Sequence, residues 1–542
     1  MSTVHAAFSD TAARTPRADF VYVESVTARA YGIERGALSW ADAAAQVEAL
    51  RRAYAAAGYG HGHRVGLLVE NRPAFFLHWF ALNALGASVV PIHAELRTAE
   101  LRYLIEHSEI VLAVTLPARE AELLAAARDV GSPLRTWPLG STAAPPAAAS
   151  PVPLASVRIG EESECALLYT SGTTGRPKGC ILTNAYYLDA GRWYAALGHL
   201  CTVRRDCERV ITPLPLSHMN AMAFSTMVVL VAGGCIVQLD RFHPSSWWDS
   251  VRESGATIVH YLGVMPAMLS VAPANLRDHE HAVRIGFGAG VDKKLHAPFE
   301  ARFGFPLLEA WAMTETGSAA CVMAHREPRH VGTSCFGRPD ATMRWRLVDD
   351  GGHDVPPGTP GELLVRAAGP SPRRDFFCGY LKDEAATEQA WAGGWFHTGD
   401  VVRADAEHNL YFVDRRKNVI RRSGENISAV EVESVLNQHP LVKAAAVAAV
   451  PDAVRGDEVL ACIVTHQPVA AGGHEVAARA IVEYTLTQLA YYKAPGHVAF
   501  VDALPLTPSQ KIQRGELKAL AAGLVGQPHC IDTTALKKRP PG

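Results

Sequence analysis

Tyr169-Thr-Ser-Gly-Thr-Thr-Gly-Arg-Pro-Lys-Gly179 is the stretch of this 542-residue sequence that says most about its fold and its ligand. A strand-like run precedes a loop of small hydroxyl residues and glycines, and the loop ends at a lysine. Gly172 and Gly175 let backbone N–H groups approach a polyphosphate closely. Hydroxyl groups and a positive charge add further donors, from Ser171, Thr173, Thr174 and Lys178. We therefore predict a phosphate-binding loop here and not a solvated turn.

The loop differs from the Walker motif, which requires Gly-Lys followed by Ser or Thr. Here Lys178 follows Pro177 and precedes Gly179. The sequence therefore predicts a phosphate loop of another class.

The segments on either side of the loop predict an α/β fold. Strand-like and helical runs alternate before it, namely Arg64–Val69, Ala74–Leu85, Ala87–Ile92, Thr98–Glu106 and Ile110–Val114. Single helices between strands imply parallel pairing within a sheet. The pattern changes at Met343–Val365 to short strands with Gly and Pro turns, which predicts an all-β subdomain. Helix and strand patterns return after about Arg416.

The composition excludes several classes of protein. A formal net charge of -2 gives no global electrostatic reason for binding nucleic acid or a membrane surface. The 10 cysteines include no C-x-x-C pair, so neither a metal centre nor a disulfide framework is predicted, and a reduced, cytoplasmic compartment is expected. The uncharged stretch Ala221–Leu239 approaches the length of a membrane-spanning helix, but Gly233-Gly234 interrupts it. We expect a buried helix, a turn and a short strand there.

Further motifs follow the phosphate loop along the chain. Ala310-Trp-Ala-Met-Thr-Glu315 offers a carboxylate of the kind that holds Mg²⁺ beside a triphosphate. Trp395-Phe-His-Thr-Gly-Asp400 ends in Thr-Gly-Asp, which are residues that favour a turn. The remaining motifs are Tyr411-Phe-Val-Asp-Arg-Arg-Lys417, Arg422-Ser-Gly-Glu-Asn-Ile-Ser428 and Leu504-Pro-Leu-Thr-Pro-Ser-Gln-Lys-Ile-Gln-Arg514.

In content and order these motifs resemble those of the adenylate-forming superfamily, which holds acyl-CoA synthetases, luciferases and peptide-synthetase adenylation domains. The resemblance spans roughly residues 35–515. It implies a large N-terminal domain of stacked α/β sheets with a β-barrel-like subdomain, residues 1–415. A small mobile α/β domain, residues 416–542, is expected to follow. The chain is most similar to the acyl-CoA synthetase branch, in particular to carnitine and crotonobetaine–CoA ligases.

The resemblance also assigns roles to single residues. Trp311 stands where the family stacks an aromatic ring on adenine, Thr314 touches the phosphate, and Glu315 helps to hold Mg²⁺. Asp400 is expected to accept hydrogen bonds from the ribose. Further nucleotide contacts are expected from Thr170, Ser171, Gly172, Thr173, Thr174, Gly175, Lys178, Gly288, Ala289 and Arg415. The sequence departs from the family in having Trp311 for tyrosine and Ala312 for glycine.

The C-terminal motifs are expected to serve two half-reactions. Lys511 resembles the lysine that catalyses adenylation, although Gln510 stands where the family usually has glycine. Gly424 resembles the loop that lines the path of the thiol, and Lys417 resembles the hinge between the two domains. His218, in Pro213-Leu-Pro-Leu-Ser-His218, stands where the family gates the carboxylate site.

We therefore predict an ATP-dependent carboxylate–CoA ligase with ATP, Mg²⁺ and coenzyme A as cofactors. Its catalytic residues are expected to be Lys511, Glu315, Thr314, Lys178 and His218. Its partners are expected to be a small carboxylic acid, ATP and coenzyme A, without nucleic acid or stable membrane insertion, in a cytoplasmic enzyme that forms a homodimer. The bulky Trp311, Met313 and His218 favour a short, medium-chain or compact acid.

Three alternatives stay open. An amino-acid adenylating enzyme with a non-CoA acceptor usually carries an acid just after the histidine motif, whereas this chain has Met219-Asn-Ala-Met. A luciferase-like oxygenase uses the same scaffold, and fold alone does not settle function. A nucleotide sensor is disfavoured by the presence of Lys178, Glu315, Asp400 and Lys511.

Overall fold

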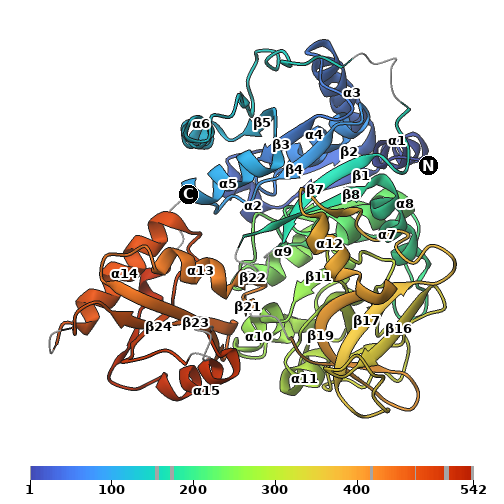
Figure 1. Ribbon diagram of the computed structural model, residues 1–542. Helices are drawn as coiled ribbons and strands as arrows, with labels where there is room; N and C mark the ends of the chain where they lie inside the picture. The colour runs from blue at the N-terminus through green and yellow to red at the C-terminus, as the bar shows by residue number, and fades with distance from the viewer. Residues whose placement is uncertain are drawn as a thin grey trace. The chain divides into compact units, whose positions relative to one another are not determined.

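The computed structural model describes residues 2–152, 158–170, 176–415, 419–469, 472–505 and 512–538. The chain divides into two compact units. The larger comprises Met1–Ala94, Ile105–Leu168 and Gly179–Asp414, and the smaller comprises Glu95–Leu104, Tyr169–Lys178 and Arg415–Gly542. Both mix helices and strands (Figure 1), which confirms an α/β fold with a large N-terminal and a small C-terminal part.

One sheet carries the strands that border the phosphate loop. Its seven strands follow the order β18-β8-β7-β4-β3-β5-β6. Their bounds are β3 Arg64–Leu68, β4 Ser88–Pro91, β5 Leu112–Thr115, β6 Arg135–Pro138, β7 Glu164–Thr170, β8 Lys178–Thr183 and β18 Gly379–Tyr380. Four of the strand pairs are parallel, as the alternating pattern predicts: β7–β4, β4–β3, β3–β5 and β5–β6. The helices between these strands and before them are α3 (Trp40–Ala56), α4 (Pro73–Asn83), α5 (Thr98–Ser108) and α6 (Glu120–Asp129).

A second sheet has eight strands in the order β14-β13-β12-β11-β9-β10-β1-β2. Their bounds are β1 Asp19–Val23, β2 Gly36–Ser39, β9 Arg209–Thr212, β10 Cys235–Gln238, β11 Ile258–Leu262, β12 Ile285–Ala289, β13 Leu307–Trp311 and β14 Val322–Met323. The strands from β1 to β13 run parallel, and β2 and β14 are antiparallel edges. The other α-helices of the larger unit are α1 (Val4–Arg14), α2 (Ser25–Tyr31), α7 (Asn184–Ala196), α8 (Met227–Ala232), α9 (Trp247–Ser254), α10 (Val264–Ser270), α11 (Lys293–Phe303) and α12 (Glu384–Ala390).

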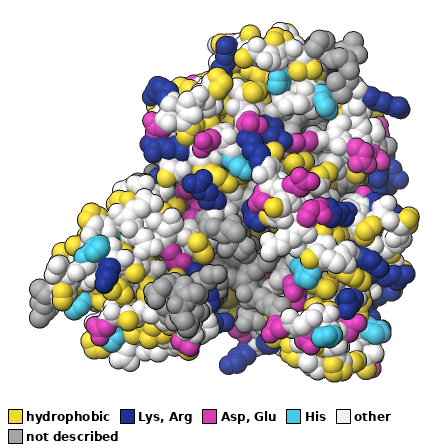
Figure 2. Space-filling view, viewed as in Figure 1, with side chains coloured by type: hydrophobic (Ala, Val, Ile, Leu, Met, Phe, Trp, Pro, Cys, Tyr) yellow, Lys and Arg dark blue, Asp and Glu magenta, His cyan; other side chains and the backbone are white. Residues whose placement is uncertain are grey.

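The uncharged stretch before β10 folds as predicted, with one difference. Its first part is a π-helix, η2 (Asn220–Thr226), which continues into α8. Gly233 and Gly234, at φ values of +82° and +121°, then turn the chain into β10. Across the described residues no helix combines the length and hydropathy needed to cross a membrane. On the face drawn in Figure 2, acidic and basic side chains are interspersed with apolar ones.

The all-β subdomain predicted around Met343–Val365 is confirmed as an antiparallel sheet. Its five strands follow the order β15-β20-β19-β17-β16, and Figure 1 shows β16, β17 and β19 side by side. The bounds are β15 Cys335–Gly337, β16 Met343–Val348, β17 Gly361–Ala367, β19 Phe396–Ala404 and β20 Leu410–Arg415. Asp400 lies in the middle of β19.

The smaller unit has one six-stranded sheet, in the order β22-β21-β24-β25-β26 with β23 paired to β24. The strands are β21 Val419–Arg422, β22 Glu425–Ser428, β23 Val442–Asp452, β24 Gly456–Thr465, β25 His497–Phe500 and β26 Cys530–Asp532. The helices are α13 (Ala429–Leu436), α14 (His474–Gln488) and α15 (Arg514–Leu524). Apolar faces of α13 and α14 cover the sheet, with Val432, Leu436, Ile481 and Val482 fully buried.

Three buried charges stabilise the start of α13 in this unit. Lys493 donates to Glu100 Oε1 at 2.6 Å and to Glu431 Oε1 at 2.9 Å, and all three side chains are at most 12% exposed. Burial acts to lower the pKa of Lys493, but the two carboxylates outweigh it and raise that pKa above its ordinary range. The lysine is therefore the counter-ion that makes burial of both carboxylates tolerable.

We predict that Lys493→Met lowers the free energy of unfolding by about 3–5 kcal/mol at neutral pH, because it leaves two buried carboxylates without a counter-ion. The loss should shrink in acid, where those carboxylates take up protons. Urea unfolding followed by circular dichroism measures both effects. The control is Arg479→Met in the exposed Arg479–Glu483 pair, for which about 0.5 kcal/mol or less is expected. A Lys493 variant as stable as this control would contradict the prediction.

Candidate active site

The carboxyl ends of β12 and β13 form the centre of the candidate site. These neighbouring strands run parallel, with Gly288 opposite Glu309. Gly288 and Ala289 therefore end one strand beside Trp311, the last residue of the other. Ligands of open α/β sheets bind outside the carboxyl ends of the strands. The structure thus brings three predicted nucleotide-binding residues to one sheet edge.

The backbone behind this edge is packed too closely for side chains. A Cβ at Gly288 would lie 2.3 Å from the carbonyl oxygen of Tyr261. A Cβ at Gly263 would lie 1.6 Å from the carbonyl oxygen of Gly290. Gly290 also has a φ of +80°, which other residues adopt only at a cost. Glycine is therefore required at these positions for steric reasons.

Glu309 holds the turn that follows β12. Its carboxylate accepts hydrogen bonds from the N–H groups of Gly290 and Val291 at 2.9 and 3.0 Å, and from the Tyr261 hydroxyl at 3.3 Å. Burial raises the pKa of Glu309, although the two backbone donors oppose the shift. The sequence analysis missed this residue. Its one signal is a lone acid inside the apolar run Leu307-Leu-Glu-Ala-Trp311.

Thr314 and Glu315 follow shortly after β13 and are held by the buried Tyr186 and the partly buried Tyr380. Tyr186 on α7 donates its hydroxyl to the Thr314 carbonyl oxygen at 2.9 Å. Tyr380 on β18 donates to Glu315 Oε1 at 2.9 Å, and the Phe377 N–H donates to the Glu315 carbonyl oxygen at 2.9 Å. The Glu315 carboxylate is thus oriented from β18, the strand paired with β8 after the phosphate loop.

Glu315 keeps one carboxylate oxygen available. The residue is 7% exposed, and Oε2 accepts no hydrogen bond from any residue in the described ranges. A carboxylate oxygen to which no described residue donates fits a hard divalent cation such as Mg²⁺. The geometry is therefore compatible with the predicted metal role of Glu315.

Trp311 and Asp400 are joined by a buried hydrogen bond. The indole Nε1 donates to Asp400 Oδ2 at 2.9 Å, and the residues are 6% and 0% exposed. The indole also stacks on Phe336, with ring centroids 6.1 Å apart. Tryptophan at this position therefore supplies both a flat ring and a donor that orients the carboxylate.

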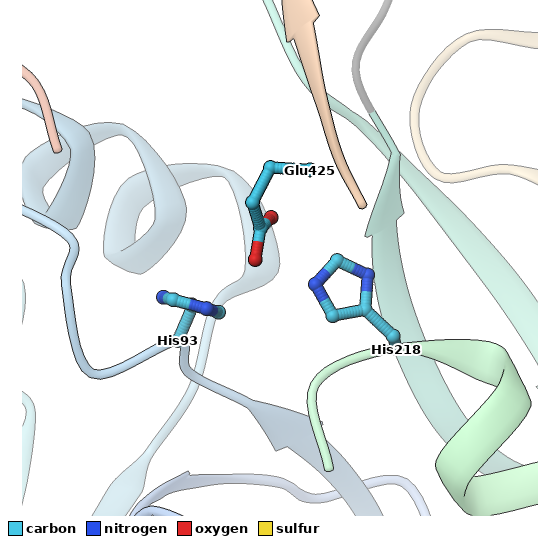
Figure 3. A group of neighbouring side chains, drawn as sticks. All are labelled: His93, His218 and Glu425. Atoms are coloured by element: carbon cyan, nitrogen blue, oxygen red, sulfur yellow. The ribbon is translucent and has the colours of Figure 1, made fainter. Parts of the chain in front are cut away.

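His218 lies beside His93, which the sequence analysis did not single out. Figure 3 shows the two imidazoles, one from the segment after β4 and one from the turn before η2. Their ring centroids are 6.0 Å apart at an interplanar angle of 77°. No sequence signal connects the two residues, because they come from different sheets.

A buried polar network lies along η2. His260 on β11 shares its Nδ1 with Ser225 Oγ at 2.7 Å and Asn220 Oδ1 at 3.1 Å, and its Nε2 contacts the Tyr194 hydroxyl at 3.1 Å. The imidazole stacks on Phe287 of β12 at 4.6 Å. Burial lowers the pKa of His260 to about 3, so the ring is neutral at physiological pH.

Two predicted residues border the phosphate loop. Thr170 is the last residue of β7 and Lys178 the first of β8. Next to Lys178, the Pro177 carbonyl oxygen accepts a hydrogen bond from the Tyr103 hydroxyl at 2.7 Å, and the Arg176 guanidinium lies 5.4 Å from the Tyr103 ring. Tyr103 on α5 is another contact that the sequence did not reveal.

In the smaller unit, Gly424 lies in the tight connection between β21 and β22 at a φ of +90°. Arg415 is the last residue of β20. The other predicted residues lie outside the described residues: Ser171, Gly172, Thr173, Thr174, Gly175, Lys417, Gln510 and Lys511. Their assigned roles stay predictions.

We predict that Trp311 and Asp400 are energetically coupled. A double-mutant cycle of Trp311→Phe and Asp400→Asn should give a coupling of about 1.5–3 kcal/mol in the free energy of unfolding, as expected for a hydrogen bond to a charged group. Trp40→Phe is the control, because its indole donates to the uncharged Gly234 carbonyl oxygen at 3.1 Å. That variant should lose about 0.5–1.5 kcal/mol from its lost hydrogen bond. A coupling near zero would show that the Trp311 contact does not orient the carboxylate.

Known proteins with similar sequences identify the family of this chain. Residues 8–373 match the model of the AMP-binding enzyme family, and residues 431–511 match the AMP-binding enzyme C-terminal domain. The sulfoacetate–CoA ligase of Cupriavidus necator is 33% identical over 501 residues, which covers 89% of this chain and 92% of that protein. The crotonobetaine/carnitine–CoA ligase of Salmonella typhi is 29% identical over 477 residues, covering 85% of this chain and 89% of the relative.

Solved structures show the same architecture. The amide bond synthetase McbA from Marinactinospora thermotolerans superposes with a TM-score of 0.79 at 25% identity, covering 96% of this chain and 99% of that one. The family match covers more than half of the sequence and includes the strand ends, the Thr314–Glu315 segment and the phosphate loop. The chain therefore belongs to the AMP-binding enzyme family and, within it, to the acyl-CoA synthetase branch.

Proposed function

We propose that this acid–thiol ligase joins a short carboxylic acid with a second polar or charged group to coenzyme A, at the expense of ATP. ATP-dependent acyl-CoA formation follows from the family and the relatives. The observation that carries the site assignment is that Gly288 and Trp311 lie at adjoining strand ends, with Asp400 bonded to Trp311 and Glu315 four residues after Trp311.

In the first step, a carboxylate oxygen attacks the α-phosphorus of ATP, and the bond to the leaving pyrophosphate breaks. All reacting groups are anionic, so preorganised positive charge is the main catalytic requirement. Lys178, at the start of β8, and Lys511 are the side chains proposed to supply it. The loop Thr170–Gly175 is proposed to hold the phosphates through its N–H and hydroxyl groups.

Mg²⁺ is the proposed metal, and bound at Glu315 it would neutralise phosphate charge. The free Glu315 Oε2 supports this role, since Tyr380 occupies only Oε1. Thr314 is proposed to contact the phosphate. The remaining nucleotide contacts are proposed to be adenine on Trp311 beside Gly288 and Ala289, and ribose on Asp400 and Arg415.

In the second step, the coenzyme A sulfur attacks the acyl carbon, the thiol proton leaves to solvent, and the bond to AMP breaks. Gly424 is proposed to line the thiol path, because a residue without a side chain lets pantetheine approach the backbone. We further propose that residues 1–415 and 416–542 act as separate domains that turn about Lys417. The Gly424 loop and Lys511 would then serve the two steps alternately.

The acyl pocket is proposed to be short. The relatives' names specify sulfoacetate and crotonobetaine or carnitine, small acids with a second charged group. In this chain the stacked rings of Tyr194, His260 and Phe287 fill the space behind β12. His218 is proposed to close the carboxylate side. A cytoplasmic location, a homodimer and independence from nucleic acid remain predictions from the sequence.

We predict opposite step-specific defects in two variants. Lys511→Ala should slow acyl-adenylate formation by about 100-fold or more, since it removes a preorganised charge, yet still acylate coenzyme A from preformed adenylate. Gly424→Leu should block thioester formation and spare adenylation. Gly424→Ala is the matched control, because it shares the strain of the positive φ but leaves the thiol path open. Single-turnover kinetics measure each step, and equal damage to both steps would exclude the two-conformation mechanism.

We predict that acid size governs turnover. In a pyrophosphate-release assay, kcat/KM for sulfoacetate, malonate or butanoate should exceed that for palmitate by at least about 10-fold, because a filled pocket excludes extra methylenes. Each acid is assayed with coenzyme A and with an amine acceptor, since McbA is an amide bond synthetase. Preference for palmitate would refute the short pocket, and amide formation without thioester would refute the proposed acceptor.

A further inference from the structure

Three charged side chains are fully buried together in the smaller unit, beside the Gly424 turn. Arg422 Nε donates to Glu458 Oε2 at 2.7 Å, and Lys537 Nζ donates to Glu458 Oε1. The side chains of Arg422, Glu458 and Lys537 are 2%, 1% and 0% exposed. We call these three residues the Glu458 cluster. Arg422 ends β21, Glu458 lies in β24, and Lys537 lies near the C-terminal end of the described chain.

The cluster places two cations on one carboxylate. Burial acts to raise the pKa of Glu458, but Lys537 and Arg422 outweigh it and hold that pKa below its ordinary range. Burial and the Arg422 charge act to lower the pKa of Lys537, and the Glu458 carboxylate opposes them. A buried ionic group of this kind is no better for stability than apolar residues of the same volume. The hydrogen bonds of the cluster instead fix the orientation of each of the three side chains.

The Glu458 carboxylate has no room to move. A Cβ at Gly496 would lie 2.4 Å from Glu458 Cδ, so the adjoining backbone packs directly against the carboxylate. Gly496 in turn accepts a hydrogen bond from the Thr533 N–H at 2.9 Å, just before the segment that carries Lys537. The C-terminal segment therefore covers the carboxylate and supplies its second cation.

The cluster is connected directly to the Gly424 turn. Arg422 immediately precedes Ser423 and Gly424, whose φ values are +50° and +90°. The Ser423 N–H donates to the Arg455 carbonyl oxygen at 2.9 Å, and the Arg421 N–H donates to Asp457 Oδ2 at 3.0 Å. The residues on both sides of Arg422 are thus held by the segment 455–458, and Glu458 holds the Arg422 side chain itself.

We propose that Glu458 is a positioning residue for acyl transfer to coenzyme A, which orients Arg422 and through it the Ser423–Gly424 turn, with Lys537 as the anchor from the C-terminal segment. The proposal rests on the proposed function, in which the Gly424 turn serves the second step. It adds residues with no part in the chemistry: Glu458 and Lys537 act only through Arg422.

The test is Glu458→Gln, which keeps the shape of the side chain and removes its charge. Thioester formation from preformed acyl-adenylate should slow by about 10–100-fold, because a displaced turn no longer holds the reacting groups in place. Pyrophosphate exchange with acid and ATP should stay unchanged. Lys537→Met should show the same step specificity with a smaller loss, because the Arg422–Glu458 bond survives. Ile481→Ala is the control, since it removes buried packing from the same unit on α14 without touching the cluster. It should lower thermal stability and leave the ratio of the two rates unchanged.

Equal slowing of both steps by Glu458→Gln, or a thioester rate equal to the wild type in a folded protein, would overturn the proposal. Should Glu458→Gln fail to fold, Lys537→Met decides the question by the same ratio. Failure of the proposed function has a different signature: the wild-type enzyme would then make acyl-adenylate without coenzyme A-dependent release of AMP. The wild-type assay is therefore run first.

Discussion

The contact of backbone with backbone at Gly263 and Gly290 is the constraint on which the candidate site depends. A Cβ at Gly263 would meet the Gly290 carbonyl oxygen, and Gly290 has a φ of +80°, so β11 and β12 end in close approach. Glu309, from the next strand, closes the turn by accepting hydrogen bonds from the N–H groups of Gly290 and Val291. These contacts set where β13 ends, and Trp311, Thr314 and Glu315 follow from that position.

The two units bury charge for different purposes. In the larger unit, Tyr380 donates to Glu315 Oε1, and no described residue donates to Oε2. In the smaller unit, Lys493 and Glu458 each satisfy two partners within the protein. The first arrangement leaves a carboxylate oxygen without a donor among the described residues, and in the second each charge is paired within the unit. Burial by itself therefore does not mark a functional residue. Whether each polar atom of a buried group has a hydrogen-bond partner within the protein is more informative.

Much of the fold was predictable because its signals are local. Alternating runs gave the parallel strands from Arg64 onward, and Gly233-Gly234 separated the apolar helix from β10. Two of the motif residues, Gly288 and Trp311, lie at the ends of neighbouring parallel strands. The tyrosines that orient the site were not predictable, since Tyr186 lies 128 positions from Thr314 and Tyr380 lies 65 from Glu315. Such partners depend on tertiary packing, and a tyrosine in a helix or an edge strand carries no sequence signal of its own.

The π-helix η2 has a consequence for comparing this enzyme with its relatives. A π-helix closes its hydrogen bonds from i to i+5, one residue more than an α-helix. The π-helix Asn220–Thr226 therefore shifts the side chains that follow it by one residue, relative to their directions in an uninterrupted α-helix. The Ser225 and Thr226 hydroxyls follow the same five-residue spacing, donating to the carbonyl oxygens of Asn220 and Ala221. An alignment of this segment with a relative whose helix is regular would have to be shifted by one position for the side-chain directions to correspond.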